Sequence, residues 1–356
     1  MTVRLYRHDD TSAPVLTGQS GSLVALLDAV LVNGYGSKTA AGWSIAQTTT
    51  NKRAYKQGAG GNHPTGIHCY IDDNAPGGGG AREARVCGFE TMSAVTPVGT
   101  GQFPNSSQSN IGIGYCVIRK SNTTDATARK WYIVADAWTF YLFIEYGEQG
   151  NVSIPLGSAF IFGDFESYKS GDAYAQIIIG RTTENTNSPA LENFSMMGVG
   201  QQDYTVNSNI AGHFVSRHWN QLVVSARCGK QADMFVSGPN AAWTGNDQLG
   251  QDGNTEGYIG LGTSERQRLY FPYPNPVDGS MWMAPIYVNQ NGIRGYLKGL
   301  WCPKHFMPLN PGDTFTAASG NLSGKSFIAV SSSMRWADSN WWVPTQVFLE
   351  FSDTWP

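Results

Sequence analysis

The sequence predicts a mainly β protein, an antiparallel β-sandwich or meander that carries one N-terminal amphipathic α-helix. Charged residues make up only 14% of the 356 residues, against about 25% in an average soluble domain. The chain instead holds 42 glycines, 11 tryptophans, 16 tyrosines and 16 phenylalanines. Aromatic side chains suit a half-buried pleated surface, and glycine suits the turns between strands. Short apolar runs between turn residues recur along the chain, whereas helical periodicity is clear at one place.

That helical segment spans Leu23 to Gly36 and has an apolar stripe. Ser20 or Ser22 is expected to cap its first turn, and Asn33-Gly34 supplies a left-handed stop. We expect the stripe to pack on the β core, where each side chain contributes about 1.5 to 3 kcal/mol before entropy is counted. The stripe consists of Leu23, Leu26, Leu27, Val30 and Leu31.

An antiparallel meander is expected after the helix, because short strand-like runs alternate with turns rich in Gly, Asn and Thr. The predicted runs are Trp43 to Gln47, Arg53 to Gln57, Ile67 to Asp72 and Arg85 to Glu90. Lys130 to Gly147 indicates a largely buried hairpin that turns at Asp136-Ala137. Two further apolar strands are predicted, at Ala159 to Phe162 and Ala175 to Ile179.

The second half of the chain is predicted to begin with long loops and to end with closely spaced strands. Thr182 to Pro276 is expected to form long loops that carry contacts, with strands only at His213 to Ser216 and Gln221 to Ala226. The closing strands are predicted at Ala284 to Val288, Ile293 to Leu300, Ser326 to Ser331 and Gln346 to Phe351. A boundary near Arg181 would divide the chain into a helix-plus-β domain (1–181) and a β-rich, loop-rich region (182–356), unless both pack as one continuous domain.

Charge and hydropathy narrow the classes of partner. The formal net charge of −3 gives no basic footprint for nucleic acid. The longest apolar run lies in the predicted helix; it is too short to span a bilayer and is interrupted by Asp28. The polar N-terminus has no features of a secretion signal. We therefore expect no nucleic-acid partner, no membrane partner and synthesis in the cytoplasm.

The five cysteines are predicted to be buried thiols. Their number is odd and no CxxC spacing exists, which excludes a zinc ribbon and argues against a disulfide framework. A disulfide between Cys69 and Cys87, on neighbouring predicted strands, is the less favoured alternative. The cysteines are Cys69, Cys87, Cys116, Cys228 and Cys302.

Several acidic or glycine-rich stretches resemble binding motifs without completing them. Asp72-Asp73 precedes a glycine-rich turn, where aspartate commonly bonds to its own backbone. Gly77 to Gly80 lack the Lys-Ser/Thr and the helix that cradle phosphate. Residues 252–257 imitate the start of an EF-hand loop, but Thr263 stands where the bidentate acid belongs. We therefore expect no metal and no cofactor.

Catalytic signatures are equally incomplete. Asp164 and Glu166 are two residues apart and could form a glycosidase pair, although spacing alone shows neither a cleft nor the separation of the carboxyl groups. The six histidines have no metal-binding spacing, and no GxSxG elbow is present. The sequence therefore predicts a binding or structural protein and not an enzyme, with catalysis at Asp164 and Glu166 ranked last.

The candidate contact residues are three tryptophans in one loop, "MRWADSNWWVPTQ". Exposed, such rings could stack on sugars; packed inward or against another chain, they would anchor an interface. We favour packing or an interface, with glycan contact as the alternative. These residues are Trp336, Trp341 and Trp342.

Several segments resemble a family of uncharacterised structural proteins of tailed bacteriophages and prophages. The similarity is colinear from Ser12 to Trp355 and is carried by "LLDAVLVNGYGSK", "TNKRAYKQG", "YIDD", "ARVCGFETMSAV", "TGQFP", "KSNTTDATARKWYIVADAWTFYLF", "FGDFESYKSGDAY", "PYPNPVDG", "RGYLKGLWCPKH" and "SDTW". Some members carry an inserted β domain between the helix and the Trp43 strand. That variation implies that the helix end near Gly36 lies at the surface.

The resemblance implies a multi-copy, tail-associated virion protein, assembled in the host bacterial cytoplasm. Its partners would be copies of itself and other virion proteins, met through Thr182 to Pro276 and Met1 to Gly18. Few charges and many aromatic anchors suit such interfaces. The alternatives are a decoration protein of the capsid exterior and a carbohydrate-binding module that contacts a host-surface glycan.

Overall fold

The fold was analysed in a computed structural model of the chain. It describes residues 2–94, 97–106, 114–148, 155–181, 184, 211–223, 235–237, 277, 279–281, 283–289, 293–303, 309–320, 322–330, 333–335, 342–344, 347–352 and 354–355.

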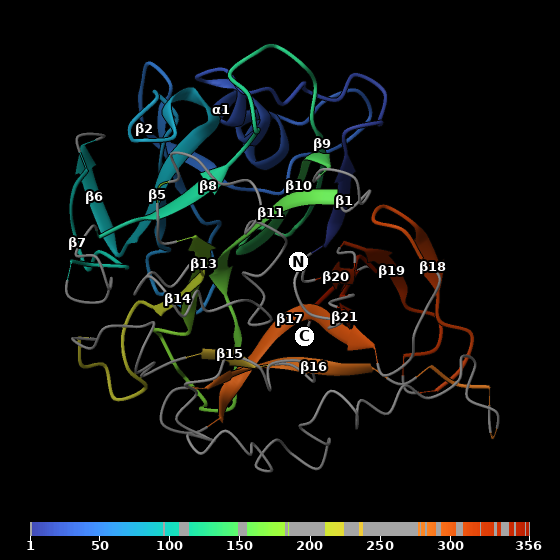
Figure 1. Cartoon of the computed structure of the whole chain (residues 1–356). Helices are drawn as coiled ribbons and strands as arrows, with labels where there is room; N and C mark the ends of the chain where they lie inside the picture. Colours follow the sequence, from blue (N-terminus) through green and yellow to red (C-terminus); the bar gives the residue numbers. More distant parts are fainter. Residues whose placement is uncertain are drawn as a thin grey trace.

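The largest element is an antiparallel sheet of 11 strands, coloured from blue through green to the yellow of β14 in Figure 1. Its strands, in spatial order, are β1 (Arg4–Arg7), β9 (Lys130–Ala135), β10 (Thr139–Glu148), β11 (Pro155–Asp164), β13 (Gln176–Arg181), β8 (Cys116–Arg119), β5 (Glu83–Phe89), β4 (His68–Asp72), β3 (Lys52–Lys56) and β2 (Ser44–Thr49), with β14 (Ala211–Val215) also pairing with β13.

A second antiparallel sheet has seven strands. It contains β15 (Phe235–Ser237), β16 (Met283–Asn289), β17 (Ile293–Pro303), β22 (Phe348–Glu350), β19 (Ser326–Ala329) and β18 (Thr314–Thr316), and β12 (Glu166–Ser167) pairs with β17. In Figure 1 its strands β15, β16 and β17 lie below the first sheet, and β18 and β19 lie to the right. Two small hairpins pair β6 (Thr91–Ala94) with β7 (Val98–Thr100) and β20 (Ser333–Arg335) with β21 (Trp342–Pro344). The predicted mainly β, antiparallel class is confirmed.

The predicted helix is present, with an unexpected second half. α1 (Ser22–Leu27) continues directly as a π-helical segment, η1 (Asp28–Asn33), and Gly34 ends it with φ 77°. All five residues of the predicted stripe are 0% exposed, so the stripe packs on the β core as expected. Gly36 and Ser37 are exposed, which agrees with a helix end at the surface. A single 3₁₀ turn, η2, occupies Gly80–Arg82.

The predicted cap of this helix was wrong. Gly21 stands at the N-cap with φ 83°, and no side chain of that residue can cap the turn. The carboxylate of Asp73 instead accepts the Leu23 N–H at 2.9 Å, from 50 positions along the chain. The other carboxylate oxygen pairs with the ammonium of Lys120, and both side chains are 0% exposed. Asp73 was also expected to bond to the backbone of its own turn. Its carboxylate instead contacts the start of the helix and Lys120.

The meander and the hairpin form as predicted. β2, β3, β4 and β5 are consecutive antiparallel neighbours, and β9 and β10 form the hairpin. Asp136 fixes its turn, because one carboxylate oxygen accepts the N–H groups of Trp138 and Thr139, both at 2.8 Å. Most predicted strands begin or end within two residues of the observed ones, although β11 begins four residues before its predicted start.

Both sheets contribute to one hydrophobic cluster, which runs from the helix to the C-terminal strands. The Tyr141 hydroxyl of β10 donates to the carbonyl of Lys298 in β17 at 2.7 Å, and its ring meets Trp355 edge-on. β12 and β14 each pair across the boundary expected near Arg181. The division at that residue stays a prediction, beside the alternative of one continuous domain.

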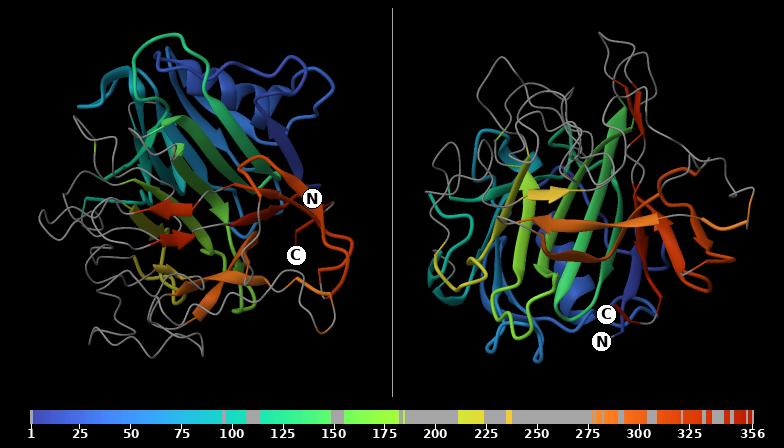
Figure 2. Two further views of the ribbon diagram at one scale, coloured as in Figure 1. Left: turned by 45° about the vertical axis from the view of Figure 1, so that its right-hand side comes forward. Right: turned by 90° about the horizontal axis from the view of Figure 1, so that it is seen from below.

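The ends of the chain lie side by side (Figure 2), where Thr2 and Thr354 form a β-bridge. Cys69, Cys87 and Cys116 are buried free thiols, as predicted. The alternative Cys69–Cys87 disulfide was wrong: Cys69 faces the main core, whereas Cys87 packs with Tyr70 and Phe89 in a separate cluster.

Candidate interaction surface

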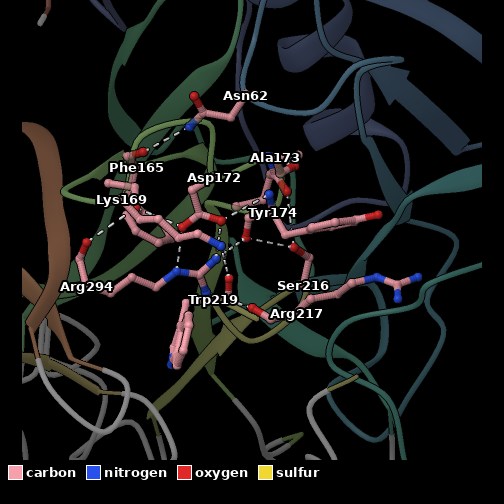
Figure 3. Close-up of polar contacts among 12 residues, drawn as sticks. Asn62, Phe165, Lys169, Asp172, Ala173, Tyr174, Ser216, Arg217, Trp219 and Arg294 are labelled. Atoms are coloured by element: carbon pink, nitrogen blue, oxygen red, sulfur yellow. Dashed lines mark hydrogen bonds and ion pairs between the residues drawn. The ribbon is translucent and has the colours of Figure 1, made fainter. Parts of the chain in front are cut away.

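A buried arginine in β17 joins three segments that are distant in the sequence. The Arg294 guanidinium donates to both carboxylate oxygens of Asp172, from Nε and Nη2, at 2.8 Å each. It also donates to the backbone carbonyls of Arg217 at 2.7 Å and Tyr174 at 2.9 Å. Figure 3 shows these contacts converging on the guanidinium. Arg294 therefore ties β17 to the loop before β13 and to the segment after β14.

Asp172 is held as a carboxylate by this contact. Burial opposes its ionisation, but the hydrogen bonds and the charge of Arg294 outweigh burial and lower the pKa of Asp172. A hydrogen bond from the Ser167 hydroxyl, at 2.8 Å, acts in the same direction. Because both charged side chains are almost fully buried, loss of either one would leave an uncompensated charge.

We expect a specific pH dependence from Asp172. The unfolded chain takes up this proton near the ordinary value of 3.8, and the folded protein takes it up at lower pH. The stabilisation is therefore complete above the unfolded pKa and is lost as the pH falls through the folded pKa. Urea unfolding of the wild type and of Asp172→Asn should show a stability difference that shrinks between about pH 5 and pH 2.5. A difference that stays constant across that range would contradict this assignment.

An exposed apolar surface lies on the three segments that Arg294 joins. Its members are Tyr168 (60% exposed), Trp219 (50%), Leu222 (63%), Val223 (60%) and Ile293 (49%). We call these five residues the Trp219 surface. They are five of the nine large hydrophobic residues that are exposed among the described residues. Such gathering marks an interaction site more than scattered exposed residues do.

Contacts between these segments hold the Trp219 surface in place. The Tyr168 N–H donates to the carbonyl of Arg294 at 2.8 Å. The Tyr168 ring lies 5.9 Å from that of Tyr296. The Lys169 ammonium donates to the carbonyl of Trp219 and lies 5.6 Å from the centre of its ring. In Figure 3 the Trp219 ring extends away from the polar cluster.

Asp164 and Glu166 occupy the corner where the chain passes from one sheet to the other. Asp164 ends β11 in the large sheet, and Glu166 begins β12 in the second. Asp164 is 1% exposed, and its carboxylate accepts the Asn62 N–H at 2.6 Å and the Gln57 amide at 2.9 Å. Burial raises the pKa of Asp164 against these hydrogen bonds. This arrangement gives Asp164 a structural task at the corner; that the chain is not an enzyme stays a prediction.

The tryptophans proposed from the sequence are not tested by the structure. Trp336 and Trp341 lie outside the described residues, as does the EF-hand-like stretch 252–257. Trp342 lies in β21 opposite Arg335, and its side chain is outside the description. Trp219 and Leu222 do fall within the expected contact region Thr182 to Pro276. Trp219 has no sequence signal of its own, because it is a single apolar residue in a polar turn. Leu222 belongs to the strand predicted at Gln221 to Ala226, but residues 221–223 lie outside any observed strand, and residues 224–226 lie outside the described residues.

No three His, Cys, Asp or Glu side chains in the described part of the chain converge on a position that could hold a metal ion. Among the same residues, no helix has the length and apolar character needed to cross a bilayer. Models of known protein families give no match to this sequence, and neither do curated proteins.

Proposed function

We propose that the protein is a multi-copy structural component of a tailed-bacteriophage particle, associated with the tail and acting through protein–protein interfaces. The observation that carries this proposal is the Trp219 surface, an apolar group on segments that Arg294 joins by hydrogen bonds. Aromatic and aliphatic side chains in such a setting are the usual anchors of protein interfaces. The resemblance to phage structural proteins supplies the setting, a virion assembled in the host cytoplasm.

The architecture supports a scaffold role. Both sheets share one core, and several ionic contacts are buried within it, including Lys120 with Asp73 and Arg294 with Asp172. These ion pairs place charged side chains in the interior of a chain that has few charges. Few charges therefore remain on the surface, where they would repel neighbouring copies. Low charge at the centre of a contact is a feature of protein interfaces.

Purified particles test the proposal directly. We expect the protein in gradient-purified particles after a high-salt wash, at several copies per particle by quantitative mass spectrometry. An antibody against the chain should label the tail in electron micrographs. Labelling of the capsid shell would assign the protein to capsid decoration instead. A protein that is found free in lysates and is absent from washed particles would refute a structural role.

A further inference from the structure

We infer that the Trp219 surface binds the same surface of a second copy of this chain, around a two-fold axis that passes close to Tyr168. The inference rests on the proposed multi-copy function and names the contact through which copies would meet. Three observations carry it: the chemistry of the apolar residues, two charges that flank Tyr168, and the hydrogen bonds and ion pair that join the supporting segments.

The apolar residues favour a protein over a sugar as the occupant. Leu222, Val223 and Ile293 are about as exposed as the two aromatic residues beside them. Aromatic rings can stack on sugars, but branched aliphatic side chains offer a sugar no flat face and no hydrogen bond. Burying them against another apolar surface releases water at about 25 cal/mol per Å².

Two opposite charges flank Tyr168, and neither has a charged partner among the described residues. Lys169 contacts the carbonyl and ring of Trp219 but has no carboxylate among its described contacts. Glu166 lies opposite Tyr296 in the β12–β17 pair, and its carboxylate takes part in no described ion pair or hydrogen bond. One cation and one anion thus lie on either side of Tyr168 in the sequence.

That arrangement is self-complementary. In a two-fold contact the same patch of both copies meets. If one residue of the first copy touches a second residue of the other copy, the reverse contact between the two copies also forms. With the axis near Tyr168, Lys169 of each copy faces Glu166 of the other, and each charge gains an oppositely charged partner that the described residues do not provide. The Tyr168 and Trp219 rings then meet at the centre of the contact, where anchors usually lie.

The support under this surface is already ordered. Arg294 joins β17 to the loops that carry Tyr168 and Trp219. Arg217, two residues before Trp219, forms a two-point ion pair with Glu90 at the end of β5. A second copy would therefore lose little conformational freedom from these segments on binding, which favours association.

Charge exchange tests the inference. Lys169→Glu and Glu166→Lys should each weaken self-association by about tenfold or more, because like charges would face each other twice per dimer. An equimolar mixture of the two variants should associate again, since every Glu–Lys contact is restored between unlike copies. The double variant should associate more strongly than either single variant, although it lacks the contacts of Lys169 with Trp219. Sedimentation velocity over a concentration series, with native mass spectrometry of the mixture, measures all four samples.

The apolar part has its own variant and control. Trp219→Ser should abolish association, whereas Val98→Ser should leave it unchanged; Val98 is 52% exposed in β7, outside the Trp219 surface and outside both segments expected to make contacts. Circular dichroism checks that each variant folds. The inference would be overturned if the wild type is monomeric at every concentration. It would also be overturned if the wild type dimerises and neither Trp219→Ser nor charge exchange changes that association. A monomer that binds a glycan array through Trp219 would overturn it as well.

The same variants separate this inference from the proposed function. The two-fold contact would be refuted, and the structural role kept, by one combination of results. The protein would be found in particles but be monomeric in solution, and its Trp219→Ser variant would be incorporated normally. A charge-exchangeable dimer that is absent from washed particles would support the contact and defeat the structural role.

Discussion

Lys120→Met is expected to destabilise the protein by about 3 to 5 kcal/mol, because it leaves the Asp73 carboxylate buried without its counter-ion. Both side chains are 0% exposed. The Lys120 ammonium also donates to the carbonyl of Gln19 at 2.7 Å, next to the start of the helix. Burial raises the pKa of Asp73 and lowers that of Lys120, and the attraction between the two charges opposes both effects. Denaturant unfolding measures the loss.

A neighbouring ion pair provides the matched control. Lys52 contacts Asp72 at 2.7 Å, but the Lys52 side chain is 30% exposed, so Lys52→Met should cost about 1 kcal/mol or less. The double variant Lys120→Met/Asp73→Asn removes both charges and keeps an acceptor for the Leu23 N–H. It should recover roughly half or more of the loss. Equal losses for Lys120→Met and Lys52→Met would show that burial of the first pair has no energetic consequence.

Leu27→Asp should unfold the N-terminal region, with a loss of more than about 5 kcal/mol. Removal of a buried leucine side chain alone costs about 2 to 5 kcal/mol, and the new carboxylate would lie in the apolar core without a partner. Leu27 is 0% exposed and belongs to the main core cluster. Thermal unfolding followed by circular dichroism measures the loss, and hydrogen exchange shows which strands lose protection first.

Ala25 gives the control on the same helix. It is exposed, so Ala25→Asp introduces the same carboxylate into the same element and should cost less than about 1 kcal/mol. A Leu27→Asp protein that folds with normal stability but fails to assemble would show that the stripe faces another chain. That result would contradict the packing described above.

Much of the fold follows from patterns that are local in the sequence. The leucine stripe, the β2–β5 meander and the hairpin at Asp136 depend on periodicity and turn chemistry within short windows. Other strands were missed: β1, β8, β12, β15, β18 and the short pairs β6–β7 and β20–β21. β8 consists of four buried residues, Cys116–Arg119, and so short a run shows little pattern until neighbouring strands are in place.

Less of the candidate interaction surface was predictable. Arg294 lies in a strand that the sequence identifies, and a cation within an apolar strand hints at a buried partner. That partner, Asp172, is 122 positions away in what reads as an ordinary polar turn. Trp219 and Tyr168 carry no pattern at all, because isolated apolar residues in loops are as often buried as exposed.

By itself the sequence determined the mainly β class, the helix and its buried stripe, and the order of the meander, since these depend on neighbours within a turn or a strand. The tertiary structure decided which distant groups meet. It placed Asp73 on the helix start, joined Arg294 to Asp172, and left Trp219 exposed on the loops that this arginine holds. Such contacts depend on which strands become neighbours in the sheets, and that is fixed only when the whole core packs.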